Sequence, residues 1–246
     1  MRIPAQRQFY FHGLPGSSAE LRLFDNAIAE QIEVLHPLDF DRFQNTEAAH
    51  GPYRIIGFSL GAFSALRLAA TKPERVKELI LISPAAPLEI GNFLPDMAGA
   101  PVFRTAQSSA LALAGLTSIQ SVATALAPQW LIKQLLAETC ETEQALLKDP
   151  AFVSVLIDGL KSSFGPKAGL YRKAVRSYVR PWANDLQQIH CPCKIIHGDK
   201  DTWAPVEMAK ALSDALPGQT ELLIKNDLGH YSTLIRTLPS IIAQEQ

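Results

Sequence analysis

The stretch Arg54-Ile55-Ile56-Gly57-Phe58-Ser59-Leu60-Gly61 joins an apolar, strand-like run to a helical pattern over Leu60–Ala70. Its last five residues form a G-x-S-x-G, in which two glycines flank a serine. A sharp strand-to-helix turn strains its central residue, and the glycines remove side chains that would collide there. Such a turn would lift the Ser59 hydroxyl above a sheet, beside a helix N-terminus that favours negative charge. A plain tight turn without chemistry is the alternative interpretation.

Strand-like runs and helical patterns alternate on both sides of this stretch. The expected strands are Gln8–Phe11, Glu33–His36, Arg54–Phe58, Lys77–Ser83, Lys194–His197 and Glu221–Ile224. Further helical patterns cover Ala19–Gln31, Val206–Leu216 and the segment after His230. Strands that alternate with helices predict right-handed crossovers, and hence an α/β fold with a doubly wound, mostly parallel sheet of about six strands.

The middle of the chain shows helical patterns only, broken by several prolines. About 100 residues of helix are too many for one crossover between neighbouring strands. We therefore expect residues 1–86 and 185–246 to form the core, and residues 87–184 to form a helical lid inserted over the strand ends.

Composition excludes several classes of protein. The 246 residues include 23 Lys and Arg against 24 Asp and Glu, so the basic field of a nucleic-acid-binding protein is missing. Three cysteines are too few for a disulfide framework. Of these, Cys191 and Cys193 have only His190 nearby as a further metal ligand, so reduced thiols are expected rather than a metal site.

The chain shows no pattern typical of membrane insertion. Its first seven residues lack the apolar stretch of a signal peptide, and Ala106–Ala127, the nearest match to a membrane span, is interrupted by Ser, Thr and Gln. A cytoplasmic protein without a membrane span is the expectation.

Three more segments place chemically capable residues after expected strands. His12-Gly13-Leu14-Pro15-Gly16-Ser17-Ser18 follows the first strand and would leave backbone N–H groups free to meet an oxyanion. The other two are His197-Gly198-Asp199-Lys200-Asp201-Thr202-Trp203-Ala204-Pro205 and Leu228-Gly229-His230-Tyr231. Taken singly, each is also consistent with an ordinary polar loop. Together they place a serine, an acid and a histidine in that order, each just past a separate strand.

In these four motifs, HGLPGSS, GFSLGA, HGDKDTWAP and LGH, the chain resembles the α/β-hydrolase superfamily, in its serine-hydrolase (esterase- and lipase-like) branch. The resemblance implies Ser59 as nucleophile and His230 as general base and acid. It selects Asp201 rather than Asp199 as the orienting acid, because Asp201 fits the pattern H-G-x-x-D-x-x-x-P. The backbone N–H groups of Leu14 and Leu60 would form the oxyanion hole. In the family, two strands usually precede the first motif; because only eleven residues come before it here, we expect both to be missing.

The resemblance implies hydrolysis of a carboxylic ester or thioester through an acyl-enzyme, with no cofactor and no metal. The alternatives are a carbon–carbon bond hydrolase or lyase on the same fold, and a ligand-binding protein without turnover. Neither the acyl chain, the leaving group nor the oligomeric state follows from the sequence.

The expected lid carries cations without acids between Asp158 and Asp185. Arg172, Arg176 and Arg180, here called the arginine stripe, share one helical face at a spacing of four. A solvated face is one interpretation; contact with an acidic or carrier-bound substrate is the other. The aromatic residues of this region (Phe152, Phe164, Tyr171 and Tyr178) are expected in the core.

Overall fold

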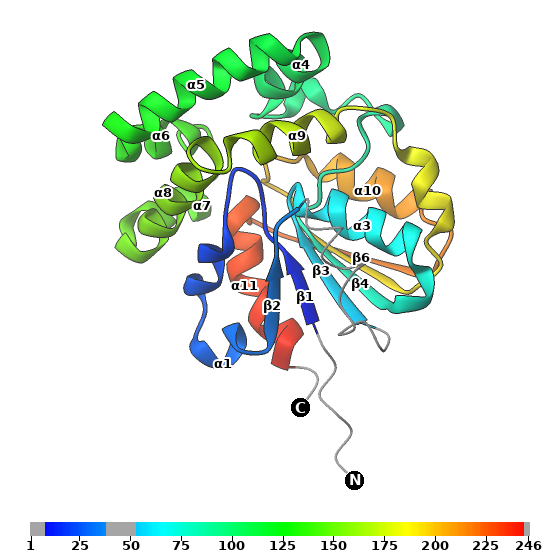
Figure 1. Cartoon of the computed structure of the whole chain (residues 1–246). Coiled ribbons are helices and arrows are strands. Elements are labelled where there is room, and N and C mark those ends of the chain that lie inside the picture. The colour runs from blue at the N-terminus through cyan, green and yellow to red at the C-terminus, as the bar shows by residue number, and fades with distance from the viewer. Residues whose placement is uncertain (1–7, 38–52, 244–246) are drawn as a thin grey trace.

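The computed structural model describes residues 8–37 and 53–243, and within them a six-stranded sheet forms the centre (Figure 1). The strands are β1 (Gln8–Phe11), β2 (Ile32–Leu35), β3 (Tyr53–Phe58), β4 (Val76–Ile82), β5 (Cys193–Gly198) and β6 (Thr220–Lys225). Their order is β2-β1-β3-β4-β5-β6, and every neighbouring pair is parallel. The predicted fold class and strand number are confirmed, and each strand lies within one or two residues of its predicted position.

The central strands are buried on both faces, which explains their nearly continuous apolar sequences. In β3 and β4 the side chains of Ile55, Leu79 and Leu81 are fully buried. Parallel strands need helical crossovers, and these helices cover the faces of the sheet. The core helices are α1 (Asn26–Ala29), α3 (Gly61–Thr71), α10 (Val206–Ala215) and α11 (His230–Ala243), with 3₁₀ turns η1 (Ser18–Leu23) and η2 (Pro73–Arg75).

The strand order reverses next to β1, and this point locates the site. The chain runs from β1 outward to β2 and then returns to β3 on the other side of β1. In open parallel sheets, the crevice for ligands lies at the carboxyl ends of the strands, at such a switch point. The loop His12–Ser17 leaves β1 there, and Ser59 follows β3 directly.

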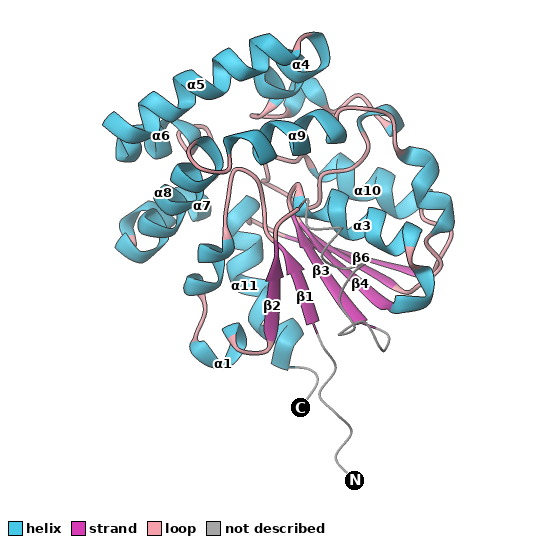
Figure 2. Cartoon of the chain, in the orientation of Figure 1, coloured by secondary structure: helices cyan, strands magenta, loops and turns pink. Residues whose placement is uncertain are grey.

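Between β4 and β5 the chain forms helices only, and they lie over the carboxyl ends of the strands (Figure 2). The helices are α4 (Ala100–Ser108), α5 (Ala110–Leu126), α6 (Pro128–Leu135), α7 (Glu141–Ala145), α8 (Pro150–Phe164) and α9 (Ala168–Tyr178). Short 3₁₀ turns accompany them: η3 (Leu88–Ile90), η4 (Leu94–Asp96), η5 (Leu146–Lys148) and η6 (Ala183–Gln188). We call residues 100–178, from α4 to α9, the helical insertion.

The single helix expected over Ala19–Gln31 is wrong. The segment breaks at Phe24 and Asp25, which have extended backbones, into η1 and the four-residue α1. Asp25 is instead the N-cap of α1: its side chain accepts a hydrogen bond from the N–H of Ile28 at 3.0 Å and so starts a new helix. The seven N-terminal residues, on which the expectation about a signal peptide rested, lie outside the described residues.

Candidate active site

Ser59 occupies a strained turn between β3 and α3. Its φ angle is 54°, in the left-handed region that a residue with a side chain seldom adopts. A Cβ added to Gly57 would lie 2.7 Å from Cα of Ala62, and one added to Gly61 would lie 2.2 Å from the Phe11 carbonyl oxygen. Both positions therefore require glycine, because the backbone approaches too closely for a side chain. Gly61 lets the turn at Ser59, here called the elbow, pack directly against the end of β1. Strain that the surroundings enforce is frequent at functional positions.

Asp201 and His230 form a buried pair. His230 Nδ1 lies 2.7 Å from Asp201 Oδ2, and both side chains are almost fully shielded from solvent. The other carboxylate oxygen, Oδ1, accepts hydrogen bonds from the N–H groups of Trp203 at 2.9 Å and Ala204 at 3.0 Å. Asp201 is thus fixed by its own loop and can hold the imidazole in one tautomer, with the proton on Nδ1 and Nε2 free to accept.

The pair is also coupled electrostatically. Burial alone would lower the pKa of His230, but the charge and hydrogen bond of Asp201, together with the charges of Glu143 and Glu20, raise it above its ordinary value. Burial opposes ionisation of Asp201, yet His230 and His197 together with the N–H of Ala204 hold the pKa of this carboxyl below its usual range. Asp201 is therefore ionised at neutral pH, as an orienting acid must be.

Asp199, the rejected acid, has a different environment. Its carboxylate accepts a hydrogen bond from the N–H of Asp227 at 2.7 Å and lies 3.7 Å from the ammonium of Lys200. It is half-buried and ties the loop after β5 to the loop after β6. The structure brings Asp201, and not Asp199, to His230.

The histidine lies beside the elbow. Its ring centroid is 4.8 Å from that of Phe58, the residue before Ser59, and the Trp203 ring stacks on it at 5.7 Å with an interplanar angle of 19°. Among the hydrogen bonds of the described residues, none joins Ser59 to His230. Bonds between a nucleophile and its base are often long without substrate and tighten when it binds.

Two backbone N–H groups near this point have no acceptor among the described residues. In the described part of the chain, neither Leu14 N–H nor Leu60 N–H donates a hydrogen bond to the protein. Leu60 is the N-cap of α3, where the helix dipole favours negative charge. Both leucines and Ser59 line one pocket, so the donors and the hydroxyl open onto the same space.

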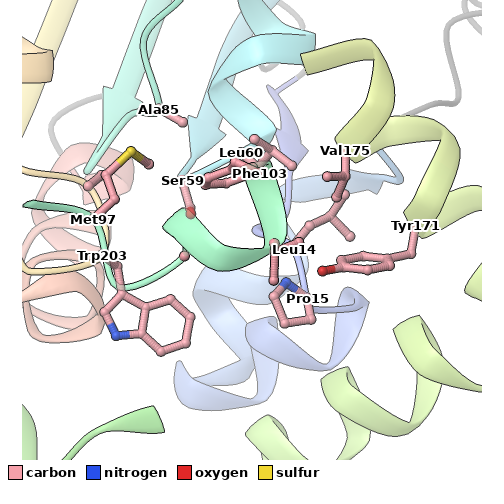
Figure 3. A pocket seen from close by; sticks show the side chains of 13 residues that line it. Leu14, Pro15, Ser59, Leu60, Ala85, Met97, Phe103, Tyr171, Val175 and Trp203 are labelled. Carbon is pink, nitrogen blue, oxygen red and sulfur yellow. The ribbon is translucent and has the colours of Figure 1, made fainter. Parts of the chain in front are cut away.

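This pocket is mostly apolar (Figure 3). Its lining brings together the elbow, the loop after β1 and the helical insertion: Leu14, Pro15, Ser59, Leu60, Ala85, Met97, Gly99, Val102, Phe103, Tyr171, Val175, Trp203 and Ala204. A second apolar pocket adjoins it and reaches Leu131 and Leu135 of α6. The two pockets share five lining residues: Pro15, Gly99, Val102, Tyr171 and Trp203. Tyr171 and Phe164, both expected in the core, are buried but also line this cleft. Phe152 and Tyr178 are core residues as expected.

Two buried acids near the site were not predicted. Glu143, in α7 of the insertion, is fully buried and accepts hydrogen bonds from the N–H groups of Tyr231 at 2.6 Å and Ser232 at 2.9 Å. These are first-turn donors of α11, the helix that begins with His230, and such donors have no acceptor within their own helix. Glu143 therefore anchors the insertion to the segment that carries the histidine. No sequence pattern marks it.

Glu20 supports the loop after β1. Its Oε2 accepts a hydrogen bond from the hydroxyl of Tyr10 at 2.6 Å and one from the N–H of Gly13 at 3.3 Å, while Oε1 is buried without a partner. Burial raises the pKa of Glu20 to about 7, against the two hydrogen bonds, which lower it. The motif Ser17-x-x-Glu20 resembles a capping box, but the Glu20 carboxylate accepts a hydrogen bond from the Tyr10 hydroxyl instead.

The arginine stripe does not line the pocket. Tyr171 and Val175 of α9 face the cleft, whereas Arg176 and Arg180 are exposed and Arg172 is half-buried. The prediction that all three arginines share one helical face is wrong for Arg180, because α9 ends at Tyr178. No described acid lies within ion-pair distance of the stripe.

The described residues contain no cluster of three His, Cys, Asp or Glu side chains suited to hold a metal ion. Burial raises the pKa of the Cys191 thiol to about 11.

The sequence matches the family described as serine aminopeptidase, S33, over residues 12–232. The chain belongs to this family of α/β hydrolases. The match spans all four motifs and confirms the resemblance that they carry. A search of curated proteins gave no match.

Solved structures of other α/β hydrolases share the fold of this family member at low sequence identity. A thermophilic esterase from Thermogutta terrifontis aligns with a TM-score of 0.67 and 17% identity, over 97% of this chain and 88% of the esterase. An enol-lactonase from Burkholderia xenovorans LB400 aligns with a TM-score of 0.65 and 14% identity, over 98% of this chain and 90% of the lactonase. A serine hydrolase from Cycloclasticus zankles aligns with a TM-score of 0.64 and 15% identity, over 97% of this chain and 88% of the serine hydrolase.

Proposed function

We propose that this α/β hydrolase cleaves a carboxylic ester or thioester by covalent catalysis, with Ser59, His230 and Asp201 as its triad. The observation that carries the proposal is the buried 2.7 Å contact between His230 and Asp201, beside a strained serine elbow that opens onto a pocket. A serine hydroxyl is a weak nucleophile unless a positioned base accepts its proton. In this proposal His230, oriented by the ionised Asp201, is that base.

In the first half of the reaction, Ser59 Oγ forms a bond to the carbonyl carbon while its proton passes to His230 Nε2. The carbonyl π electrons move to the oxygen, and the N–H groups of Leu14 and Leu60 stabilise that oxyanion. The intermediate collapses, the bond to the leaving alkoxide or thiolate breaks, and the leaving group takes the proton from His230. Asp201 stabilises the transient imidazolium and remains ionised throughout.

In the second half, water replaces the leaving group. His230 accepts a proton from the water as its oxygen attacks the acyl carbon, and the same two N–H groups hold the second oxyanion. Breaking the bond between the carbon and Ser59 Oγ releases the acid, and His230 returns the proton to the serine. For this step the acyl-enzyme must remain open to water.

The lining of the pocket supports an apolar acyl or alcohol group. The 13 lining residues include no Asp, Glu, Lys or Arg. A peptide substrate held by its free amino group, as the family name would suggest, needs a carboxylate in the pocket. The buried acids of the site all have partners already: Asp201 contacts His230, Glu20 is bonded to Tyr10, and Glu143 is bonded to α11. We therefore favour esters over peptides, and we assign the helical insertion the role of a lid on this pocket.

The arginine stripe suggests a further preference. Because these arginines lie outside the lining, they would meet only a part of the substrate that extends from the pocket. An acidic leaving group or an acidic carrier would fit them. This contact is part of the proposal and depends on the ester chemistry.

A panel of p-nitrophenyl esters of increasing acyl length, assayed beside acyl thioesters and an aminoacyl p-nitroanilide, tests the proposal. We expect turnover of esters and little of the anilide, with activity lost in Ser59→Ala. Inactivity on both ester panels would contradict the proposal and favour the carbon–carbon hydrolase, lyase or non-catalytic alternatives.

A further inference from the structure

Helices α5 and α6 lie at the outer edge of the molecule, away from the sheet (Figure 1). Exposed side chains of these two helices form an apolar face. It consists of Leu111, Ile119, Val122, Leu126 and Trp130, whose exposed fractions are 82%, 69%, 58%, 80% and 58%. At 100° per residue, the four positions in α5 fall within an arc of about 80°, on one side of the helix. Contiguous exposed apolar side chains of this kind mark interaction surfaces.

The segment that bears the apolar face carries no charge. Residues 105–132, between Arg104 and Lys133, include no Asp, Glu, Lys or Arg. In the described part of the chain, no single helix is long and apolar enough to cross a membrane. The pair α5 and α6 meets the length and composition requirements only together, and it bends by 118° between the two helices. This geometry fits helices that lie on a membrane better than helices that cross it.

The rest of the helical insertion is basic. Residues 100–178 contain eight Lys and Arg against five Asp and Glu, a formal net charge of +3, whereas the whole chain has −1. Seven of the eight cations are exposed, and none lies within ion-pair distance of a described acid. Among the acids, Glu143 is buried under α11, and Asp158 is paired with Arg22 of the core. The insertion therefore presents both exposed cations without a described ion pair and an uncharged apolar face.

We propose that the helical insertion docks on an anionic lipid surface, with the apolar face inserted among the acyl chains and exposed cations of the same insertion at the headgroups. Apolar area and attraction between Lys or Arg and anionic lipids are the two terms that bind such helices. A second copy of the chain fits the face less well, because two insertions of charge +3 would then oppose each other. Docking does not depend on the proposed ester chemistry.

The position of the cleft adds a consequence that does rest on the proposed function. Gln120 of α5, and Leu131 and Leu135 of α6, line the apolar pocket next to that of Ser59. The helices that would contact lipid thus also border the route to the nucleophile. An apolar ester dissolved in the bilayer would reach Ser59 between them.

Vesicle binding tests the proposal, with Trp130 as an internal probe. Of the three tryptophans, Trp182 is buried and Trp203 half-buried, so a change in the environment of Trp130 should dominate the emission shift. We expect co-sedimentation with phosphatidylcholine vesicles containing 25% phosphatidylglycerol, a blue shift of emission, and weaker binding at 0.5 M salt, where charges are screened. Trp130→Phe should abolish the shift and retain most of the binding.

The matched variants separate the apolar face from the fold. Ile119→Asp with Leu126→Asp should weaken binding at least tenfold. Ile224→Asp should leave it unchanged, because Ile224 is a partly exposed side chain on β6, outside the insertion. Ser59→Ala should bind vesicles like the wild type, so failure of the ester proposal and failure of docking are distinguishable. No binding, equal binding by the double variant, salt-independent binding to neutral vesicles, or a dimer that the double variant dissociates would each overturn the proposal.

Discussion

Glu143→Gln should uncouple the helical insertion from His230, the proposed general base. The carboxylate accepts two N–H groups at the start of α11, one on each oxygen, at 2.6 and 2.9 Å. An amide offers only one oxygen, so one donor would lose its acceptor and meet an NH₂ group instead. Hydrogen bonds to charged groups contribute about 1.5–3 kcal/mol each, so the loss should cost roughly 2–3 kcal/mol. For a chain of this size that corresponds to a fall in Tm of roughly 4–12 °C.

The same substitution should move the acid limb of the kcat/KM pH profile, because it removes a negative charge near His230. The negative charge of Glu143 is one of the causes that raise the pKa of His230. His230 must be unprotonated to act as a base, so a lower pKa moves the acid limb of kcat/KM to lower pH. Displacement of the histidine by a fraction of an ångström should also reduce kcat/KM about 10- to 100-fold at the optimum.

Thermal unfolding and a pH profile of ester hydrolysis measure both effects. Glu141→Gln is the matched control, because Glu141 lies two residues away on α7, is exposed, and undergoes the same chemical change. It should leave the Tm and the profile unchanged. A lower Tm with an unmoved acid limb would mean that Glu143 is only structural, and an unchanged Tm would refute the reasoning altogether.

Three further predictions concern other charged groups. Asp201→Asn should lower kcat by about 10³- to 10⁴-fold, as loss of a triad aspartate does, while Asp199→Asn should have little effect; equal losses in steady-state kinetics would refute the assignment. Charge reversal across the arginine stripe should raise KM for acidic substrates and spare neutral esters, and identical kinetics on both would leave it a solvated face. Because the folded-state pKa of Glu20 is raised from 4.5 to about 7, its contribution to stability is complete below pH 4.5 and is lost as pH rises through 7. Glu20→Gln should therefore remove about 3 kcal/mol of that pH dependence in denaturant titrations, and parallel curves would contradict it.

Sequence reasoning succeeded where the local pattern and the tertiary requirement coincide. The G-x-S-x-G motif predicts a sharp turn, and the structure gives the reason in the 2.2 Å approach between Gly61 and the end of β1. Central strands such as β4 are recognisable because burial on both faces demands a continuous apolar run. The ends of β5 and β6 shifted by a residue, since pairing with a neighbour extends a strand beyond its apolar residues.

The break at Phe24 and Asp25, which made the single-helix prediction wrong, has a local cause. The other features that sequence reasoning missed depend on contact between distant segments. Glu143 is 88 residues away in sequence from Tyr231 of α11, whose N–H it accepts, and no local sequence pattern around Glu143 predicts this contact. Glu20 fits a local capping pattern, but Tyr10 on the neighbouring strand offers it a buried hydroxyl. In α9, spacing alone predicted a shared face for the arginine stripe, but the helix ends at Tyr178 and leaves Arg180 outside it. Only the packing shows that Tyr171 faces the cleft.

The most direct test of the central claim is labelling by a fluorophosphonate, followed by mass spectrometry of the peptide around Ser59. An activated serine reacts, whereas an ordinary hydroxyl does not. We expect one labelled residue, Ser59, with no label in Ser59→Ala and severely slowed labelling in a folded His230→Ala. The labelling rate should fall as pH drops through the pKa of His230, which lies above the ordinary 6.5. Label on another serine, or labelling of His230→Ala at the wild-type rate, would contradict the account.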